Sequence, residues 1–310
     1  MDTTELIRDI LSGVEEQVGI HVPWLTVAPD YVGSERDSKN TGPTGFDLAG
    51  INEWEPGDRL DYRNTARTGW RTKYTLVFEQ PRQLSVALFV ESSATIDYGM
   101  VDQTKKRLTA TLMASILLNT ACTSDLASYG IWSGTTLLQY RKSAPAGRQI
   151  VPALNAYLDP DAETDDTEPT SESGLAQLIE RLPTNRRCLV FIISDGLSES
   201  DIGALDQVAG LHDFVVLKVG DLRERELPAG FGFREIEDVA TGRTISIWLS
   251  AKSRDAWRTA FDERRRQLSE QLGALGIALE EFFTNESAEA IAEKLVPIFA
   301  GYRPIQDGTS

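Results

Sequence analysis

Residues with side-chain oxygens follow two apolar segments of the sequence, 84–90 and 188–193, and another such residue precedes the helical pattern at 174–182. They are Glu91, Ser93, Thr95, Ser173 and Asp195. Carboxylates and hydroxyls without histidine or cysteine suit hard divalent cations. We therefore predict that these five residues form a site for Mg²⁺ or Mn²⁺. Ser, Thr and Asp after strands are also common helix N-caps and turn formers, so a purely structural role stays open.

The apolar segment 84–90 organises the rest of the chain. Most of its side chains are too apolar for a strand with one exposed face, which indicates a central strand covered on both sides, as in a parallel sheet. In open α/β sheets, ligands bind at the carboxyl ends of the strands. The oxygen cluster after residue 90 is therefore expected at the functional edge of the sheet.

Strands and helices alternate along most of the sequence, which predicts an α/β fold with a doubly wound, mostly parallel, Rossmann-like sheet. We expect an N-terminal extension over 1–78 (helix, loop and a segment packing on the core), the α/β domain over 79–303 and a tail over 304–310. The expected helices span 3–18, 104–120, 150–158, 174–182, 200–211, 253–275 and 287–300. The expected strands span 73–79, 84–90, 126–132, 135–140, 188–193, 214–219, 233–239, 244–249 and 277–283.

The composition is strongly acidic, with 47 acidic against 31 basic residues and a formal net charge of -16. Such a chain repels nucleic acid and anionic membranes unless a local basic patch overrides the field. The first residues carry Asp2 and Glu5 where a signal peptide needs positive charge. No stretch approaches the roughly 18 apolar residues of a membrane span. We expect a cytoplasmic protein without a membrane span.

The oxygen cluster resembles the metal-ion-dependent adhesion site of von Willebrand factor A domains. That site uses Asp-x-Ser-x-Ser after the first strand, a Thr from a second loop and an Asp after a later strand. The first motif falls on Glu91, Ser93 and Thr95, the Thr on Ser173 and the last Asp on Asp195. The resemblance implies a von Willebrand factor A-like fold with a degenerate adhesion site, because Glu91 adds a methylene to the usual aspartate.

A second resemblance covers more of the chain. The segment EWEPGDRLDYRNTAR is similar to the signature of the domain of unknown function 58 family, and the later blocks DLRERELP, EDVATGR and FFTNES agree with it in order. The matching signature residues are Trp54, Gly57, Asp58, Arg59, Asp61, Tyr62, Ala66 and Arg67. The resemblance implies a von Willebrand factor A-like adaptor or co-chaperone-like partner of a MoxR-type AAA+ ATPase.

The signature segment is locally basic and rich in aromatic residues. We predict that Arg59, Arg63 and Arg67 contact a partner. Basic and aromatic side chains together can also bind nucleic acid by stacking and phosphate contact. The alternative, which the acidic net charge favours, is that Asp58 and Asp61 pair with these arginines and fix the segment in place.

Two classes of function remain from the sequence. The first is a non-enzymatic protein-interaction module that docks a partner at the carboxyl edge of the sheet, where the cation accepts an acidic side chain of the partner. The second is a metal-dependent hydrolase with Glu91 as general base and Asp195 as metal ligand. Neither a Gly-x-Gly-x-x-Gly turn nor a nucleotide-binding P-loop motif is present, so dinucleotide binding and nucleotide hydrolysis are not expected.

Overall fold

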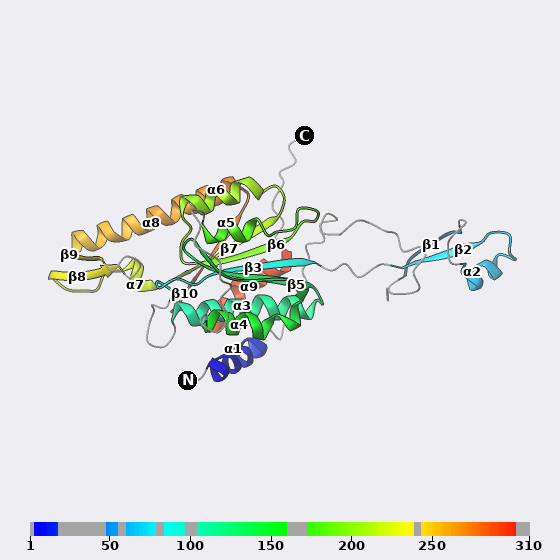
Figure 1. The fold of residues 1–310 in the computed structure, drawn as a ribbon, viewed down its shortest axis with the longest axis horizontal. Helices are drawn as coiled ribbons and strands as arrows, with labels where there is room; N and C mark the ends of the chain where they lie inside the picture. The colour runs from blue at the N-terminus through cyan, green and yellow to red at the C-terminus, as the bar shows by residue number, and fades with distance from the viewer. Residues whose placement is uncertain are drawn as a thin grey trace. The chain divides into compact units, whose positions relative to one another are not determined.

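A sheet of six strands forms the centre of the larger of two compact units (Figure 1). The computed structural model describes residues 3–17, 48–54, 60–78, 84–96, 104–159, 173–238 and 243–301. The strand order is β10-β7-β6-β3-β4-β5, and all pairs are parallel except β4–β5. The strands are β3 (Ser85–Glu91), β4 (Leu126–Ser133), β5 (Thr136–Pro145), β6 (Leu189–Ser194), β7 (Asp213–Gly220) and β10 (Ala278–Phe283).

Strand β3 lies inside the sheet, between β4 and β6, and residues 85–90 are all buried. Its side chains alternate between two hydrophobic clusters, as the pleat of a strand requires. Val86, Leu88 and Val90 belong to one cluster, whereas Ala87 and Phe89 belong to the other. The prediction of a central strand covered on both faces is therefore confirmed.

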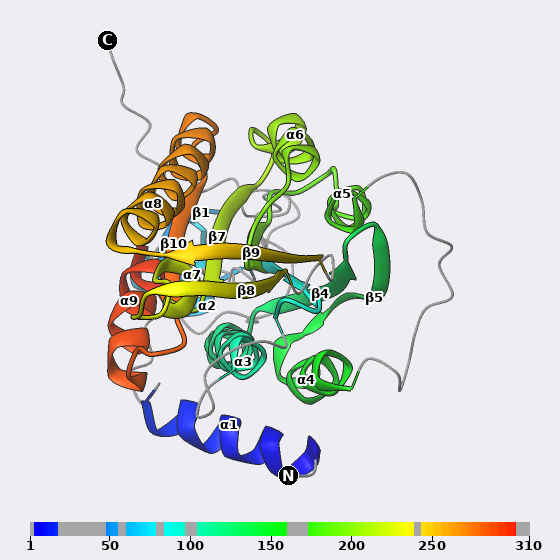
Figure 2. The same cartoon turned by 90° about the vertical axis from the view of Figure 1, so that its left-hand side faces the viewer.

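Helices cover both faces of this sheet (Figures 1 and 2). One layer contains α3 (Lys105–Cys122), α4 (Ile150–Leu158) and α9 (Ala288–Gly301). The other contains α5 (Gly174–Ile179), α6 (Glu199–Val208) and α8 (Ala251–Ala274). The doubly wound α/β architecture predicted from the alternation of strands and helices is confirmed. No helix in the described part of the chain combines the length and apolar character that a membrane crossing needs.

The N-terminal helix α1 (Thr3–Gln17) belongs to the larger unit. Ile7, Ile10 and Val14 are buried in the cluster that also holds α3 and α4, as expected from an apolar stripe at helical spacing. The compact units are 1–31 with 84–310, and 32–83. They therefore differ from the division expected from the sequence, which grouped this helix with the signature segment.

The smaller unit contains an antiparallel pair of strands, β1 (Leu48–Glu53) and β2 (Tyr74–Phe78), and the short helix α2 (Tyr62–Arg67). The sequence predicted β2 but neither β1 nor α2. Asp61 is the N-cap of α2, because its carboxylate accepts hydrogen bonds from the backbone N–H groups of Arg63 and Asn64, both at 3.2 Å.

Two further strands, β8 (Gly232–Asp238) and β9 (Arg243–Leu249), pair antiparallel with Phe233 opposite Trp248. The sequence predicted this hairpin, and its expected turn at residues 241–242 lies outside the described residues. The short helix α7 (Leu222–Arg225), between β7 and β8, was not predicted.

The close packing of β4 against α5 gives a test of the core. A Cβ atom at Gly130 would overlap the side chain of Leu178, which is fully buried and has little room to move. We expect Gly130→Ala to lower the free energy of unfolding by about 1–3 kcal/mol, measured by chemical denaturation.

The matched control is Gly203→Ala, at an exposed position of α6 where an added Cβ meets nothing within 4 Å. This change should be neutral or stabilising, because alanine favours the helix over glycine by roughly 0.5–1 kcal/mol. Equal stabilities for the two variants would contradict the described packing.

Candidate functional site

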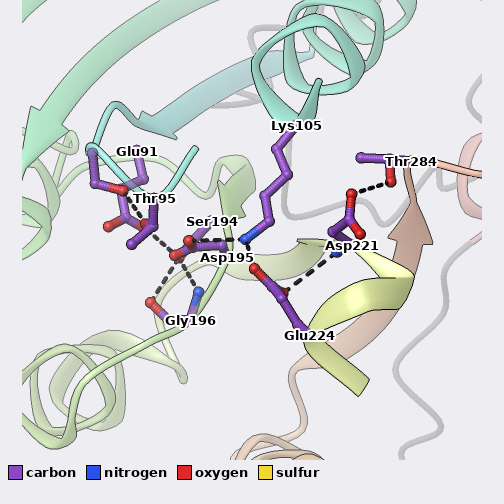
Figure 3. Close-up of polar contacts among 10 residues, drawn as sticks. Glu91, Thr95, Lys105, Ser194, Asp195, Gly196, Asp221, Glu224 and Thr284 are labelled. Atoms are coloured by element: carbon purple, nitrogen blue, oxygen red, sulfur yellow. Dashed lines mark hydrogen bonds and ion pairs between the residues drawn. The ribbon is translucent and has the colours of Figure 1, made fainter. Parts of the chain in front are cut away.

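The candidate site lies at the carboxyl edge of the sheet, where β3 and β6 are neighbours. If the six strands of this sheet are renumbered in chain order, with β3 as strand 1, their spatial order is 3-2-1-4-5-6. The chain therefore reverses its direction of winding between β3 and β6. Ligands bind at this switch point in doubly wound sheets. Glu91 ends β3 and Asp195 follows β6, so the structure brings these two predicted residues to one place (Figure 3).

The Glu91 carboxyl group is hydrogen-bonded to the hydroxyl of Ser194, the last residue of β6. The same hydroxyl contacts the carbonyl of Gly196 at 2.8 Å and accepts from its N–H at 3.0 Å (Figure 3). A hydroxyl has only one proton to donate. The Ser194 hydroxyl lies within donating distance of two acceptors, the Glu91 carboxyl group and the Gly196 carbonyl, and its one proton serves one of them at a time.

The surroundings of Glu91 make its carboxyl group a weaker acid than usual. Burial, with added repulsion from the charges of Asp195 and Asp201, raises the pKa of Glu91 from 4.5 to about 7. Hydrogen bonds from Ser194 and Ser93 act in the opposite direction and are the weaker influence. Glu91 therefore exchanges its proton near neutral pH.

The predicted hydroxyl ligands have partners within the protein. The hydroxyls of Ser93 and Thr95 are hydrogen-bonded to each other at 2.8 Å. Ser173 is the N-cap of α5, where its Oγ accepts from the N–H of Ala176 at 3.2 Å. It also donates to Asp201 of α6, a residue that the sequence analysis did not identify. Ser173 thus joins two helices.

Asp195 is paired with a cation that the sequence analysis missed. Lys105, the first residue of α3, is buried with 1% of its side chain exposed. Its Nζ lies 3.4 Å from Asp195 Oδ2 and also contacts the carboxylate of Glu224 on α7 (Figure 3). One sequence signal points to Lys105: a lysine at a helix N-terminus faces the positive end of the helix dipole and needs compensation.

Glu224 belongs to a second polar contact group at the same edge. Its carboxylate accepts from the N–H of Asp221 at 3.4 Å. Asp221 is fully buried and accepts from the hydroxyl of Thr284 at 2.8 Å (Figure 3). Asp221 and Glu224 lie in the block DLRERELP, and Thr284 lies in FFTNES. Two blocks far apart in the sequence therefore meet here.

The folded arrangement is a poor fit for a divalent ion. The predicted ligands are hydrogen-bonded or ion-paired to protein groups, and Asp195 already faces an ammonium group. Among the residues that the structure describes, no group of three or more His, Cys, Asp or Glu side chains is arranged to hold a metal ion. Mg²⁺ or Mn²⁺ binding stays a prediction from the sequence.

The predicted partner-binding arginines lie in the smaller unit. Arg63 and Arg67 are exposed on α2, next to the exposed rings of Tyr62 and Trp70, whereas Arg59 lies outside the described residues. Asp61 serves as the helix cap, and within the described residues no ion pair joins it to Arg63 or Arg67. The expected pairing of Asp61 with Arg63 and Arg67 is therefore wrong, whereas the expected pairing of Asp58, like that of Arg59, lies outside the described residues.

Most of the chain matches the model of one protein family. Residues 51–271 match the family described as "Protein of unknown function DUF58", which is more than half of the chain. The chain belongs to this family, as the resemblance of its signature and later blocks predicted. No curated protein matches the chain.

Solved structures that match this chain include BatB from Bacteroides thetaiotaomicron, at 12% identity and a TM-score of 0.43, with 70% of this chain and 100% of that one covered. An aerotolerance-related membrane protein from Bacteroides fragilis has 11% identity, a TM-score of 0.41, and coverage of 70% and 98%. A von Willebrand factor type A protein from Catenulispora acidiphila has 14% identity and a TM-score of 0.38, with 74% of this chain and 44% of that one covered. The fold class follows from the strand order itself.

The raised pKa of Glu91 predicts how stability depends on pH. Between the ordinary value of 4.5 and about 7, the folded protein keeps a proton that the unfolded chain has lost. The free energy of unfolding should therefore fall as the pH rises through this window, by up to about 3 kcal/mol from this one group.

Chemical denaturation between pH 5 and pH 8, with EDTA present, measures this change. Glu91→Gln stays uncharged throughout, so it should match the wild type at pH 5 and be more stable than the wild type at pH 8. Glu235→Gln, on an exposed part of β8, controls for the loss of a surface carboxylate. A constant difference between Glu91→Gln and wild type across the range would contradict the prediction.

Proposed function

We propose that this protein is a protein-interaction module without an enzymatic role, and that it docks a partner at the carboxyl edge of its central sheet. The observation that carries the proposal is a cluster of exposed apolar side chains on the β8–β9 hairpin. Phe231 is 77% exposed, Phe233 73% and Trp248 45%. Large exposed apolar groups gathered in one place mark interaction surfaces, and aromatic residues dominate binding energy at such surfaces.

The aromatic rings of the hairpin form one continuous group. Trp248 lies between the other two rings, with its centroid 5.0 Å from that of Phe231 and 4.7 Å from that of Phe233, both edge to face. Such contacts hold the rings in place before a partner arrives. A partner would therefore meet an apolar surface that is already arranged, and the three rings would lose little conformational freedom on binding.

The hairpin lies beyond the carboxyl ends of the strands, beside α7, which carries Glu224 (Figures 1 and 2). Helix α8 anchors this region at two points. Arg254 donates to the carbonyl of Gly230 at 2.7 Å, just before β8, and Trp257 donates to the carbonyl of Glu224 at 2.8 Å. The aromatic surface and the Lys105–Glu224 pair are thus attached to the same elements.

The partner that we propose is a MoxR-type AAA+ ATPase. The support is the resemblance to the domain of unknown function 58 family, whose members are linked to such ATPases. The exposed Arg63 and Arg67 of the smaller unit offer a second, basic contact surface for an acidic region of the partner.

The hairpin surface can be tested with two variants of the full chain. We expect the double substitution Phe233→Ala and Trp248→Ala to weaken binding to the MoxR-type ATPase of the same organism by about tenfold or more. Titration calorimetry with the purified proteins, with nucleotide present, measures the affinity.

The control is Leu211→Ala. Leu211 is 56% exposed and lies just before β7, at the opposite edge of the sheet, so its loss should leave the affinity unchanged. Equal affinities for the wild type and the double variant would place docking elsewhere. No binding by the wild-type protein would overturn the choice of partner.

One observation favours a second candidate function. A carboxyl group with a pKa of about 7 is suited to general-base chemistry near neutral pH, and Glu91 lies beside Asp195. A metal-dependent hydrolase would turn over phosphoester substrates, and Glu91→Gln would abolish that turnover. Equal rates for the wild type and Glu91→Gln would remove this candidate.

A further inference from the structure

Lys105 is held in a place that disfavours a cation. It is the first residue of α3, where the helix dipole is positive, and its side chain is almost completely buried. An ammonium group taken out of water loses much of its stabilisation unless charged partners replace the water. Its position therefore requires specific compensation.

Two carboxylates from separate segments supply this compensation. Asp195 comes from the loop after β6, and Glu224 comes from α7, directly after β7. Lys105 itself lies on the first helix after β3 (Figure 3). The ammonium group thus joins segments that follow three strands lying next to one another in the sheet.

We propose that the ammonium group of Lys105 is the built-in cation of this edge, and that it holds the loops after β6 and β7 in place without a divalent metal ion. The geometry supports this in two ways. Asp195, the carboxylate that a metal ion would need, is directed at Lys105. The hydroxyls of Ser93 and Thr95 contact each other, and that of Ser173 contacts Asp201.

The proposal does not depend on docking to an ATPase, because it concerns the isolated chain. It predicts that the wild-type protein binds no Mn²⁺ at this edge. Electron paramagnetic resonance of Mn²⁺ added to the full chain measures this, and thermal unfolding with Mg²⁺ or with EDTA should give the same midpoint. Binding of Mn²⁺ that disappears in Asp195→Asn would overturn the proposal.

A substitution tests the structural role of the ammonium group. Lys105→Met keeps most of the side-chain volume but leaves Asp195 and Glu224 facing each other without a cation. We expect the ratio of folded to unfolded protein to fall on the order of 100-fold or more. The matched control is Lys252→Met, in the first turn of α8, where the lysine is exposed and the same change should have little effect.

Equal stabilities for the two lysine variants would overturn the proposal. If Lys105→Met does not fold, Glu224→Gln gives the second measurement, because it removes one charge from the pair and keeps the shape. Glu224→Gln should also lower the ratio of folded to unfolded protein, and an unchanged ratio would overturn the proposal. The Mn²⁺ measurement on the wild type needs no variant.

Discussion

A buried ammonium group between two carboxylates constrains the functional edge of this protein. Asp195 and Glu224 compensate the buried ammonium group of Lys105, so the segments after β6 and β7 must keep their positions relative to the start of α3. If either carboxylate moved away, a buried charge would be left without a partner, which is strongly destabilising. The two ion pairs therefore favour one arrangement of these segments.

The same constraint explains why separated blocks of the sequence belong together. Glu224 contacts the N–H of Asp221, and Asp221 holds the hydroxyl of Thr284 after β10, so one line of polar contacts runs from α3 to the end of β10. Glu91 lies near Asp195 at the same edge. Burial, and after it the negative charges of Asp195 and Asp201, disfavour the ionised form of Glu91 and raise its pKa to about 7.

The sequence predicted the sheet well because its signals are local. The apolar run of β3 and the alternation of strands and helices need no long-range information. Glu91 and Asp195 were expected at one edge, and lie there, because Glu91 is the last residue of β3 and Asp195 directly follows β6. The role of Lys105 could not be predicted in this way, since it depends on a carboxylate 90 residues away. Strand β1 contains Gly50 and Asn52, which weaken the strand signal, and α2 is too short to show an apolar stripe.

The rigid edge and the exposed aromatic hairpin have complementary physical roles. Aromatic side chains give more net binding energy when their surface is already arranged before the partner binds, because ordering them on binding costs part of that energy. The hairpin begins at Gly230, which Arg254 of α8 holds, and α8 also holds α7 through Trp257. Because α7 carries Glu224, the position of the aromatic surface is linked through α8 to the ion pair of Lys105. In the proposed docking mode, the buried cation would contribute to recognition without touching the partner, because it holds the segments to which the hairpin is attached.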